Sequence, residues 1–145
     1  MIENFEKLEF NRKVDILVAI YVMGRLGKLV ERVNINEKWY DEITWLEIAE
    51  SEEDPYPGTR VGQMPKRYST YIEAAWDIVR KFDYLYLFKG GEKWNGGKWE
   101  CKLVLDDEDT RLYGWAETEQ LAICYAGLKA VGFDVQTFLQ EEGKI

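Results

Sequence analysis

Apolar side chains recur at spacings of three and four between residues 11 and 23, as they do along one face of a helix. This face is formed by Val14, Leu17, Val18, Tyr21 and Val22. The polar side chains of Arg12, Lys13 and Asp15 lie elsewhere on the helical wheel. We therefore predict an amphipathic helix here, and we expect Gly24 or Gly27 to end it in the left-handed conformation.

The same spacing, together with capping residues, predicts further helices. The first begins at Thr70, which forms with Glu73 the pattern of a capping box, and it runs to about Phe82. In a capping box a hydroxyl and a carboxylate bond to the free backbone amides of the helix start. The second runs from Thr118, a favourable cap, to Gly132. A short terminal helix is expected around 135–139.

Shorter apolar runs predict strands. Residues 84–88 and 98–105 are expected to pair across a long hairpin loop at 90–97, because the second run alternates between polar and apolar side chains. Short strands are also predicted at 43–48 and 111–115. All three prolines fall within 51–67, so this segment is predicted to be an ordered, irregular surface loop.

The mixture of helices and strands predicts an α+β fold, and composition sets its size. The chain has 145 residues, of which 46% are hydrophobic, so we expect a single domain over 1–145 around one core. No run approaches the roughly 20 apolar residues of a membrane span, and the amino terminus has no signal-peptide pattern. The protein is therefore expected to stay in the cytoplasm where it is made.

Charge and residue types narrow the classes of function. The net charge of -8 argues against broad contact with nucleic acid or an anionic membrane. The sequence has no histidine, so the commonest general base and metal ligand is missing. Cys101 and Cys124 stand in apolar surroundings without metal-type spacing, and we predict both to be small core residues. These features predict a protein without metal, cofactor or conventional catalysis.

Two segments match known binding loops only superficially. The glycines of 91–98 suggest a phosphate-binding loop, but Gly97 separates Gly96 from Lys98, and a strand rather than a helix is expected to follow. We therefore predict a hairpin tip. The acidic run at 106–109 lacks the ligand spacing of a calcium loop, so a solvated turn is expected there.

The best candidate for a binding site lies just before the helix that begins at Thr70. A helix start offers free N–H groups and a partial positive charge, so cations and hydroxyls beside it favour an anion. The predicted ligand-binding residues are Arg60, Lys66, Arg67, Tyr68, Ser69, Thr70 and Trp39. On this hypothesis the cations and hydroxyls hold phosphate, and Tyr68 or Trp39 stacks on a base.

A purely structural interpretation of the same segment stands beside this one. In it Thr70 only caps the helix, and the aromatic residues cover the sheet. The cations then pair with acidic residues of the preceding loop, namely Glu52, Glu53 and Asp54. The sequence leaves both interpretations open.

Aromatic residues are abundant, with 6 Trp and 9 Tyr. Partial burial of large rings in a small core accounts for this number as well as a binding surface does. Because Trp, Tyr and Arg dominate interface hot spots, part of the surplus is expected at the surface. A homo-oligomer is one such outcome, since these rings can meet at a symmetric contact.

Three segments together resemble a known family. They are VAIYVMG at 18–24, YSTYIEAAW at 68–76 and AICYAGLKAVG at 122–132. In this order and at these separations they resemble the phage ABA sandwich domain family of small phage and prophage proteins. The resemblance implies a three-layer α-β-α sandwich, with helices on both faces of a small, mostly antiparallel sheet, and no common activity. Arg25 stands where a Trp commonly follows the Met-Gly pair, and the 90–97 loop is longer, so loop contacts are not carried over.

The leading hypothesis for function is a phage accessory protein that counters a bacterial defence. It would bind and sequester a small nucleotide-derived immune signal without catalysis. The alternative is a protein-binding inhibitor or adaptor that acts on a host protein through its acidic surface and exposed aromatic residues. An enzyme is the least favoured class, because the spacing reveals no paired carboxylates for acid and base.

Overall fold

The computed structural model describes residues 2–31, 33–35, 37–40, 43–48, 59–62, 64–82, 84–91, 96–105 and 111–145. For 33–35, 38–40, 46–48, 59–62 and 84–85 it describes the backbone alone. The helical elements are the 3₁₀ turn η1 (Phe5–Lys7), α1 (Phe10–Leu17), the π-helical turn η2 (Val18–Val22), α2 (Ile72–Val79), α4 (Glu119–Ala130) and α5 (Val135–Glu141). The strands are β1 (Gly27–Val30), β2 (Val33–Ile35), β3 (Lys38–Tyr40), β4 (Thr44–Ile48), β5 (Thr59–Gly62), β6 (Tyr84–Lys89), β7 (Trp99–Val104) and β8 (Arg111–Ala116).

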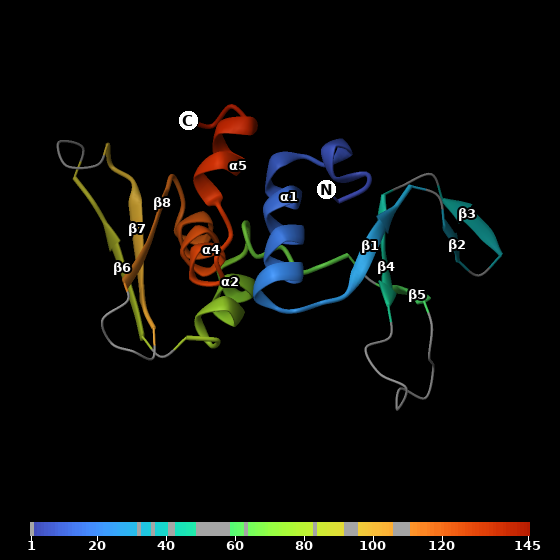
Figure 1. Ribbon diagram of the computed structural model, residues 1–145, viewed down its shortest axis with the longest axis horizontal. Coiled ribbons are helices and arrows are strands. Elements are labelled where there is room, and N and C mark those ends of the chain that lie inside the picture. The colour runs from blue at the N-terminus through green and yellow to red at the C-terminus, as the bar shows by residue number, and fades with distance from the viewer. Residues whose placement is uncertain are drawn as a thin grey trace.

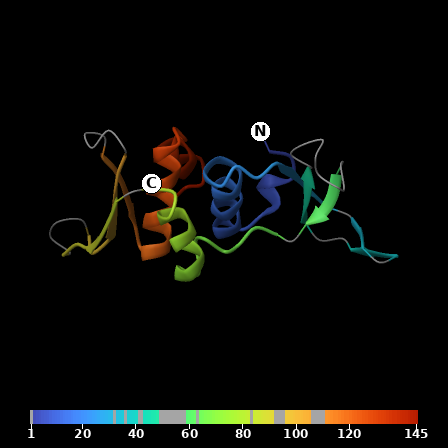
Figure 2. The same ribbon diagram turned by 90° about the horizontal axis from the view of Figure 1, so that it is seen from below.

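The strand pairs of the described residues are all antiparallel. One three-stranded sheet has the order β1-β4-β5, another has the order β6-β7-β8, and β2 pairs with β3 alone. Figures 1 and 2 show α1, α2 and α4 between the two three-stranded sheets. The predicted α+β sandwich with antiparallel strands is confirmed.

The order of the layers differs from the one that the resemblance implied. Instead of covering both faces of one sheet, the helices form the middle of the molecule, and the sheets lie outside them (Figures 1 and 2). The burial of α4 explains why this helix lies between the β6–β8 sheet and the other helices, because every residue from 122 to 128 is buried. A helix that is buried all round needs cover on opposite sides, and α4 contacts β7 and β8 as well as α2 and η2.

Small residues allow α4 to approach its neighbours closely. A Cβ atom at Gly114 of β8 would lie 2.6 Å from the backbone nitrogen of Ala126 and would overlap the carbonyl oxygen of Ala122. A Cβ atom at Gly127 of α4 would lie 2.6 Å from Cγ2 of Ile78 in α2. Glycine is therefore required where α4 meets β8, and it permits the close contact with α2.

Both cysteines lie in the core, as predicted. Cys101 and Cys124 are fully buried free thiols. Burial raises the pKa of Cys101 to about 12 and raises the pKa of Cys124 well above its ordinary value, because a thiolate is poorly stabilised away from water. Near neutral pH both thiols therefore stay protonated and pack as small apolar groups.

The predicted helix over 11–23 is confirmed as α1 followed directly by η2. Gly24 ends it with a φ of 69°, whereas Gly27 opens β1. The polar side chains of α1 are less exposed than an amphipathic pattern suggests, since Arg12, Lys13 and Asp15 are all buried. This burial follows from the position of α1 in the middle of the molecule.

The predicted strands at 43–48, 84–88, 98–105 and 111–115 are confirmed as β4, β6, β7 and β8. The prediction of an irregular loop over 51–67 is wrong in part, because β5 lies within it and pairs with β4. The sequence missed this edge strand because it is only 4 residues long and its partner lies in another segment. Residues 51–58, including Glu52, Glu53 and Asp54, lie outside the described residues.

The two carboxyl-terminal helices follow the sequence prediction. Thr118 caps α4, and its Oγ1 accepts a hydrogen bond of 3.2 Å from the backbone N–H of Leu121. Gly132 follows α4 with a φ of 86°, and α5 begins after Asp134, whose carboxylate accepts from the N–H of Thr137 at 3.0 Å.

Within the described residues, no helix combines the length and apolar character that crossing a membrane demands.

Candidate anion-binding site at the start of α2

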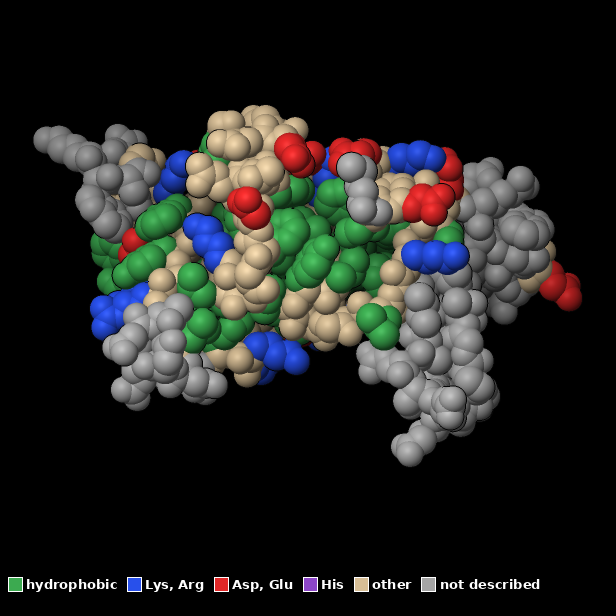
Figure 3. Space-filling view, in the orientation of Figure 1, with side chains coloured by type: hydrophobic (Ala, Val, Ile, Leu, Met, Phe, Trp, Pro, Cys, Tyr) green, Lys and Arg blue, Asp and Glu red, His purple; other side chains and the backbone are tan. Residues whose placement is uncertain are grey.

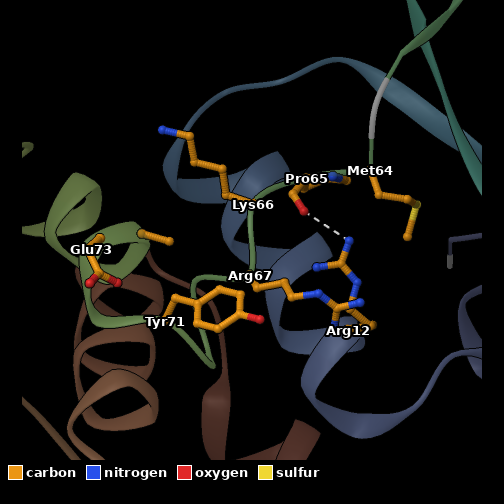
Figure 4. Close-up of a pocket in the computed structure, with 8 residues that line it drawn as sticks. Arg12, Met64, Pro65, Lys66, Arg67, Tyr71 and Glu73 are labelled. Atoms are coloured by element: carbon orange, nitrogen blue, oxygen red, sulfur yellow. Dashed lines mark hydrogen bonds between the residues drawn. The ribbon is translucent and has the colours of Figure 1, made fainter.

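A hollow of about 500 Å³ lies beside the start of α2, where this helix and the segment before it face α1. The described residues of its lining are Arg12, Met64, Pro65, Lys66, Arg67, Tyr71, Glu73 and Ala74, drawn in Figure 4. The volume falls in the range of roughly 300–1,000 Å³ that is typical of small-molecule sites. The hollow therefore has room for a ligand of nucleotide size.

Buried polar contacts with α1 hold the segment that forms one wall of the hollow. The guanidinium of Arg12 donates to the carbonyl oxygen of Pro65 at 2.9 Å and to Asp15 at 2.6 Å. Asp15 also accepts a bond of 2.8 Å from the backbone N–H of Ser69, and the Ser69 hydroxyl donates to the carbonyl oxygen of Asn11 at 3.0 Å. Because buried groups joined in this way resist displacement, the wall is fixed before any ligand arrives.

The same contacts set the ionisation of the buried groups. Burial raises the pKa of Asp15, and its hydrogen bonds with Ser69 and Arg12 offset part of this rise. Burial also raises the pKa of Tyr68, so its phenol stays protonated at neutral pH. In this segment the buried side chains thus stabilise the fold, and the exposed side chains of Lys66 and Arg67 are accessible to a ligand.

Lys66 and Arg67 are the predicted site residues that line the hollow. The ammonium of Lys66 bonds to Asp77 Oδ2 at 2.6 Å, and this bond raises the pKa of Lys66. Arg67 Nη1 lies 3.9 Å from Glu9 Oε1, at the outer limit of an ion pair. The two side chains extend in different directions in Figure 4. Arg67 therefore has the weaker ion pair of the two cations and is the more available to bind a ligand.

Among the other predicted site residues, the three whose side chains the structure describes, Tyr68, Ser69 and Thr70, are not part of the lining. Tyr68 and Ser69 are buried, at 5% and 3% exposure, so Tyr68 has no ring face free to stack on a base. Thr70 is exposed but does not line the hollow. The side chains of Trp39 and Arg60 lie outside the described residues, as do the acidic residues proposed as partners of the cations.

The predicted cap at Thr70 is wrong. The helix begins at Ile72, and its N-cap residue is Tyr71, which makes no side-chain cap bond. The backbone N–H groups of Thr70 and Tyr71 both bond to the carbonyl oxygen of Arg67, and this turn delays the helix by about one residue. The first amides of α2 therefore lack the hydroxyl acceptor that the capping box would have supplied, and a free helix start favours an anion.

Sequence reasoning missed three lining residues that give the hollow its chemistry. Arg12 comes from α1 and reaches the hollow only through the fold, so no local pattern reveals it. Tyr71 is 58% exposed and supplies the ring that was expected from Tyr68. Glu73 was assigned to the capping box, but its carboxylate lines the hollow instead. The offset of the helix start accounts for both of the latter changes.

A metal site finds no support in the described part of the chain, where no cluster of three or more His, Cys, Asp or Glu side chains is suited to hold an ion. The acidic run at 106–109, which we predicted to be a solvated turn, lies outside the described residues. The described lining of the hollow at α2 contains cations, an exposed ring and a single carboxylate. That arrangement is suited to binding an anion with a flat, polar body.

A second exposed surface lies on the side of β6, β7 and β8 that faces away from α4, which we call the outer aromatic face. Its described rings are those of Tyr86, Phe88, Tyr113 and Trp115. Tyr86 stacks on Phe88 with centroids 6.1 Å apart, and Tyr113 stacks on Trp115 at 5.6 Å. Tyr86, Phe88 and Trp115 are each at least 40% exposed. Part of the aromatic surplus thus reaches the surface, as expected.

Apolar groups are also visible over the helices. In the space-filling view, hydrophobic side chains gather in the middle of the molecule, and the described Lys, Arg, Asp and Glu side chains lie mainly around them (Figure 3).

The antiparallel sheets and the helices between them define the chain as an α+β sandwich domain. The sequence profile of the phage ABA sandwich domain family matches residues 16–128, and the chain belongs to this family. The resemblance carried by the three sequence segments is thereby confirmed. The chain is thus a phage protein domain.

A solved structure supports the fold. The 2.0 Å crystal structure of a phage protein from Bacillus cereus ATCC 14579 is similar to this chain, with a TM-score of 0.57 and 21% sequence identity. The likeness covers 89% of this chain and 94% of that chain. At this identity it concerns the fold alone. No curated protein is significantly similar to the chain.

Proposed function

We propose that this phage protein binds and sequesters a small nucleotide-derived immune signal of its bacterial host, without catalysis, in the host cytoplasm. The observation that carries the proposal is the hollow at the start of α2, where Arg67 and the exposed ring of Tyr71 lie beside an uncapped helix. Membership of a phage family supplies the setting in which such a binder acts against a bacterial defence.

Each part of a nucleotide has a matching group in the lining. The planar guanidinium of Arg67 is suited to two parallel bonds with a phosphate, and the free amides at the start of α2 add further donors. The ring of Tyr71 is suited to stacking on a base, a contact worth about 1–3 kcal/mol in nucleic-acid complexes. The carboxylate of Glu73 is an acceptor for sugar hydroxyls.

The chemistry of the lining favours binding over turnover. The sequence contains no histidine, and Glu73 is the single carboxylate among the lining residues that the structure describes. Histidine is the side chain that most often acts as general acid or base, and a pair of carboxylates is a common alternative; the described lining has neither. A sequestering protein needs affinity alone, so this set of residues is sufficient for it.

A release experiment tests the proposal. The purified protein is incubated with a panel of cyclic and linear nucleotides, washed, and examined by native mass spectrometry for a bound species. It is then denatured, and the released ligand is compared with the input by chromatography. We expect one nucleotide class to bind and to be recovered unchanged. Recovery of a hydrolysed or rearranged product would mean that the protein is an enzyme.

A matched pair of arginine variants locates the binding. Arg67→Ala removes the guanidinium of the hollow, and we expect it to weaken nucleotide binding by about tenfold or more, because hydrogen bonds to charged groups contribute roughly 1.5–3 kcal/mol. Arg111→Ala removes another exposed guanidinium, at the start of β8, which does not line the hollow. Equal binding by both variants would contradict the proposed site.

The outer aromatic face favours the alternative, a protein-binding inhibitor or adaptor. Exposed Trp and Tyr side chains are typical of interface hot spots, and Tyr86, Phe88 and Trp115 lie on one face of the sheet. Under this alternative a Trp115→Ala variant loses a host protein partner in pull-down experiments, whereas Arg67→Ala retains it. The opposite pattern, with nucleotide binding lost only in Arg67→Ala, supports the leading proposal.

A further inference from the structure

The outer edge of β6 is an open end of the β6-β7-β8 sheet. β6 pairs with β7 on one side, and on its other side it pairs with no strand of the described residues. In Figures 1 and 2 no described helix or strand lies beside this edge. The strand has 6 residues, YLYLFK, and carries exposed aromatic side chains. A long, apolar edge of this kind is a template for pairing with another chain.

The backbone groups that point to this edge follow from the register of β6 with β7. The N–H of Gly90 donates to the carbonyl oxygen of Lys98 at 3.0 Å, which continues that register by one pair. Hydrogen-bonded and non-hydrogen-bonded pairs alternate along an antiparallel ladder, so the even-numbered residues of β6 bond to β7. The N–H and C=O groups of Leu85, Leu87 and Lys89 therefore point to the open edge, where no described residue bonds to them.

The other edges of the two three-stranded sheets are shorter or are partly occupied. At the edge of β8, Lys129 Nζ donates to the carbonyl oxygen of Tyr113 at 2.7 Å. On β1, Asn4 Nδ2 donates to the carbonyl oxygen of Leu29 at 3.0 Å. The edge strand β5 has only 4 residues. Within the described part of the chain, β6 is thus the longest edge that side chains leave open.

The edge of β6 is complementary to the same edge of a second copy. Antiparallel pairing of two β6 strands about a two-fold axis at Leu87 places Leu87 opposite itself and Leu85 opposite Lys89. In this register every outward-pointing backbone group of the strand gains a partner. An axis at Tyr86 would instead place Lys89 beyond the end of the partner strand. The backbone therefore favours one register over its neighbour.

The aromatic side chains fit the same register. Non-hydrogen-bonded pairs bring opposing side chains closest together, and here such a pair consists of Tyr86 from one copy and Phe88 from the other. In the single chain these rings are 42% and 40% exposed, and they stack on each other along the strand. Pairing would extend this stack across the axis, and aromatic cross-strand pairs stabilise a sheet.

The charge at the end of the strand does not oppose this pairing. Lysine on an edge strand commonly discourages contact between copies, and Lys89 is exposed. In the register centred on Leu87, however, the two Lys89 side chains lie at opposite ends of the joint, about 14 Å apart along the strands at roughly 3.4 Å per residue. This separation exceeds the Debye length of about 8 Å at physiological salt, so their repulsion is largely screened.

We propose that a second copy of this chain pairs with β6, so that the two β6-β7-β8 sheets join into one continuous antiparallel sheet. The contact is isologous, because the same edge of both copies forms it. No residue of β6 is among the described lining of the hollow at α2. The dimer therefore goes beyond the proposed nucleotide binding and does not depend on it.

Sedimentation velocity over a range of protein concentrations tests the self-association, and we expect an equilibrium between monomer and dimer. Tyr86→Lys should raise the dissociation constant by about tenfold or more, because it places a charge opposite the ring of Phe88. Lys89→Pro should have a similar effect, because it removes an outward-pointing N–H from both copies but no bond to β7. Trp115→Ala is the control, since it removes an exposed ring of the same face from β8, and its dissociation constant should be unchanged.

An introduced cysteine tests the register. Leu87→Cys places one thiol of each copy at the two-fold axis, where opposing Cα atoms lie about 5.5 Å apart, within the range of roughly 4.4–6.8 Å for a disulfide. The native Cys101 and Cys124 are fully buried and do not compete. With oxidised glutathione we expect Leu87→Cys to form a covalent dimer in high yield. Arg111→Cys, on the outer edge strand β8, is the control and should remain mainly monomeric.

Three results would overturn the inference. One is a monomer at every concentration. Another is a loss of dimer in Trp115→Ala equal to that in Tyr86→Lys, which would place the contact on the outer aromatic face rather than at the edge. The third is equal cross-linking of Leu87→Cys and Arg111→Cys.

Circular dichroism verifies that each variant is folded. If Lys89→Pro does not fold, Tyr86→Lys remains decisive, because the Tyr86 side chain is exposed. Arg67→Ala should form the dimer like the unaltered protein, so a failure of the dimer and a failure of nucleotide binding are distinguishable.

Discussion

The starts of α4 and α2 are built in opposite ways. At α4 the chain satisfies its own helix start, because Thr118 accepts from the N–H of Leu121 and the first turns pack tightly on β8 at Gly114. At α2 the N-cap residue is Tyr71, which makes no side-chain cap bond and is 58% exposed. The start of α4 thus has a side-chain cap, whereas the start of α2 has none and lies beside cations and a hollow.

The start of α4 therefore contributes mainly to stability, and the start of α2 mainly to ligand binding. Free amides at a helix start are stabilised by a side chain, by water or by a ligand. At α4 the Thr118 side chain already accepts from one of these amides, so a ligand would have fewer free donors to bind. At α2 the N-cap residue makes no such bond, so the corresponding amides remain available for an anion. Substitutions at the start of α4 should therefore change mainly stability, and substitutions at the start of α2 should change mainly ligand binding.

The largest expected effect is at the contact of α4 with β8. Gly114→Ala would place a Cβ atom 2.6 Å from the backbone nitrogen of Ala126, and backbone on both elements leaves no flexible side chain to move aside. We expect the free energy of unfolding to fall by about 3 kcal/mol, the upper part of the range for overpacked cores. Denaturant unfolding measures it. Gly91→Ala, where nothing lies within 4 Å, is the control and should be nearly neutral.

The next effect is the loss of the α4 cap. Thr118→Ala removes the hydroxyl that accepts from Leu121, and such a change costs about 1 kcal/mol. Thermal unfolding should show a lower midpoint, and Thr118→Ser should restore most of it because the serine hydroxyl caps equally well. If Thr118→Ala unfolds like the unaltered protein, the cap contributes nothing and the contrast with α2 disappears.

A smaller effect of opposite sign is expected at α2. Tyr71→Asn introduces a favourable cap at an extended backbone position, and it should raise the free energy of unfolding by about 0.5 kcal/mol. The same change removes the exposed ring and occupies the free amides, so nucleotide binding should weaken. Tyr71→Phe keeps the ring without adding a cap, and neither stability nor binding should change much. A Tyr71→Asn variant that is both more stable and fully competent in binding would refute the division of roles.

The smallest effect on stability is expected from Lys66→Gln. The ion pair of Lys66 with Asp77 is exposed to solvent on the lysine side, and exposed pairs contribute little after screening and side-chain entropy are counted. The midpoint of thermal unfolding should match that of the unaltered protein within error, whereas the affinity for a phosphate-bearing ligand should fall. A clear loss of stability would show that the cations near α2 serve the fold.

The elements of this fold could largely be predicted from the sequence, but the site could be predicted only in part. Periodicity located α1, α4 and three strands of the β6–β8 sheet, because each of these segments shows its spacing within its own residues. Thr118 was found by its local pattern, and Thr70, with the same kind of pattern, was not a cap. Thr70 is not a cap because its N–H and that of Tyr71 bond to the carbonyl oxygen of Arg67, which forms a turn before the helix. Contacts of Ser69 with Asn11 and Asp15 in α1 hold this turn in place.

What the sequence determined by itself was the set of local preferences: which segments are helical or extended, the absence of histidine, and the cations that precede α2. The tertiary structure alone decided the order of the layers, the burial of Arg12 and Asp15, and the exchange of Tyr68 for Tyr71 at the hollow. The physical reason is that helix and strand patterns depend on neighbouring residues. Burial and exposure depend instead on which distant segment covers each face, and one residue of offset at a helix start turns a different side chain toward the solvent.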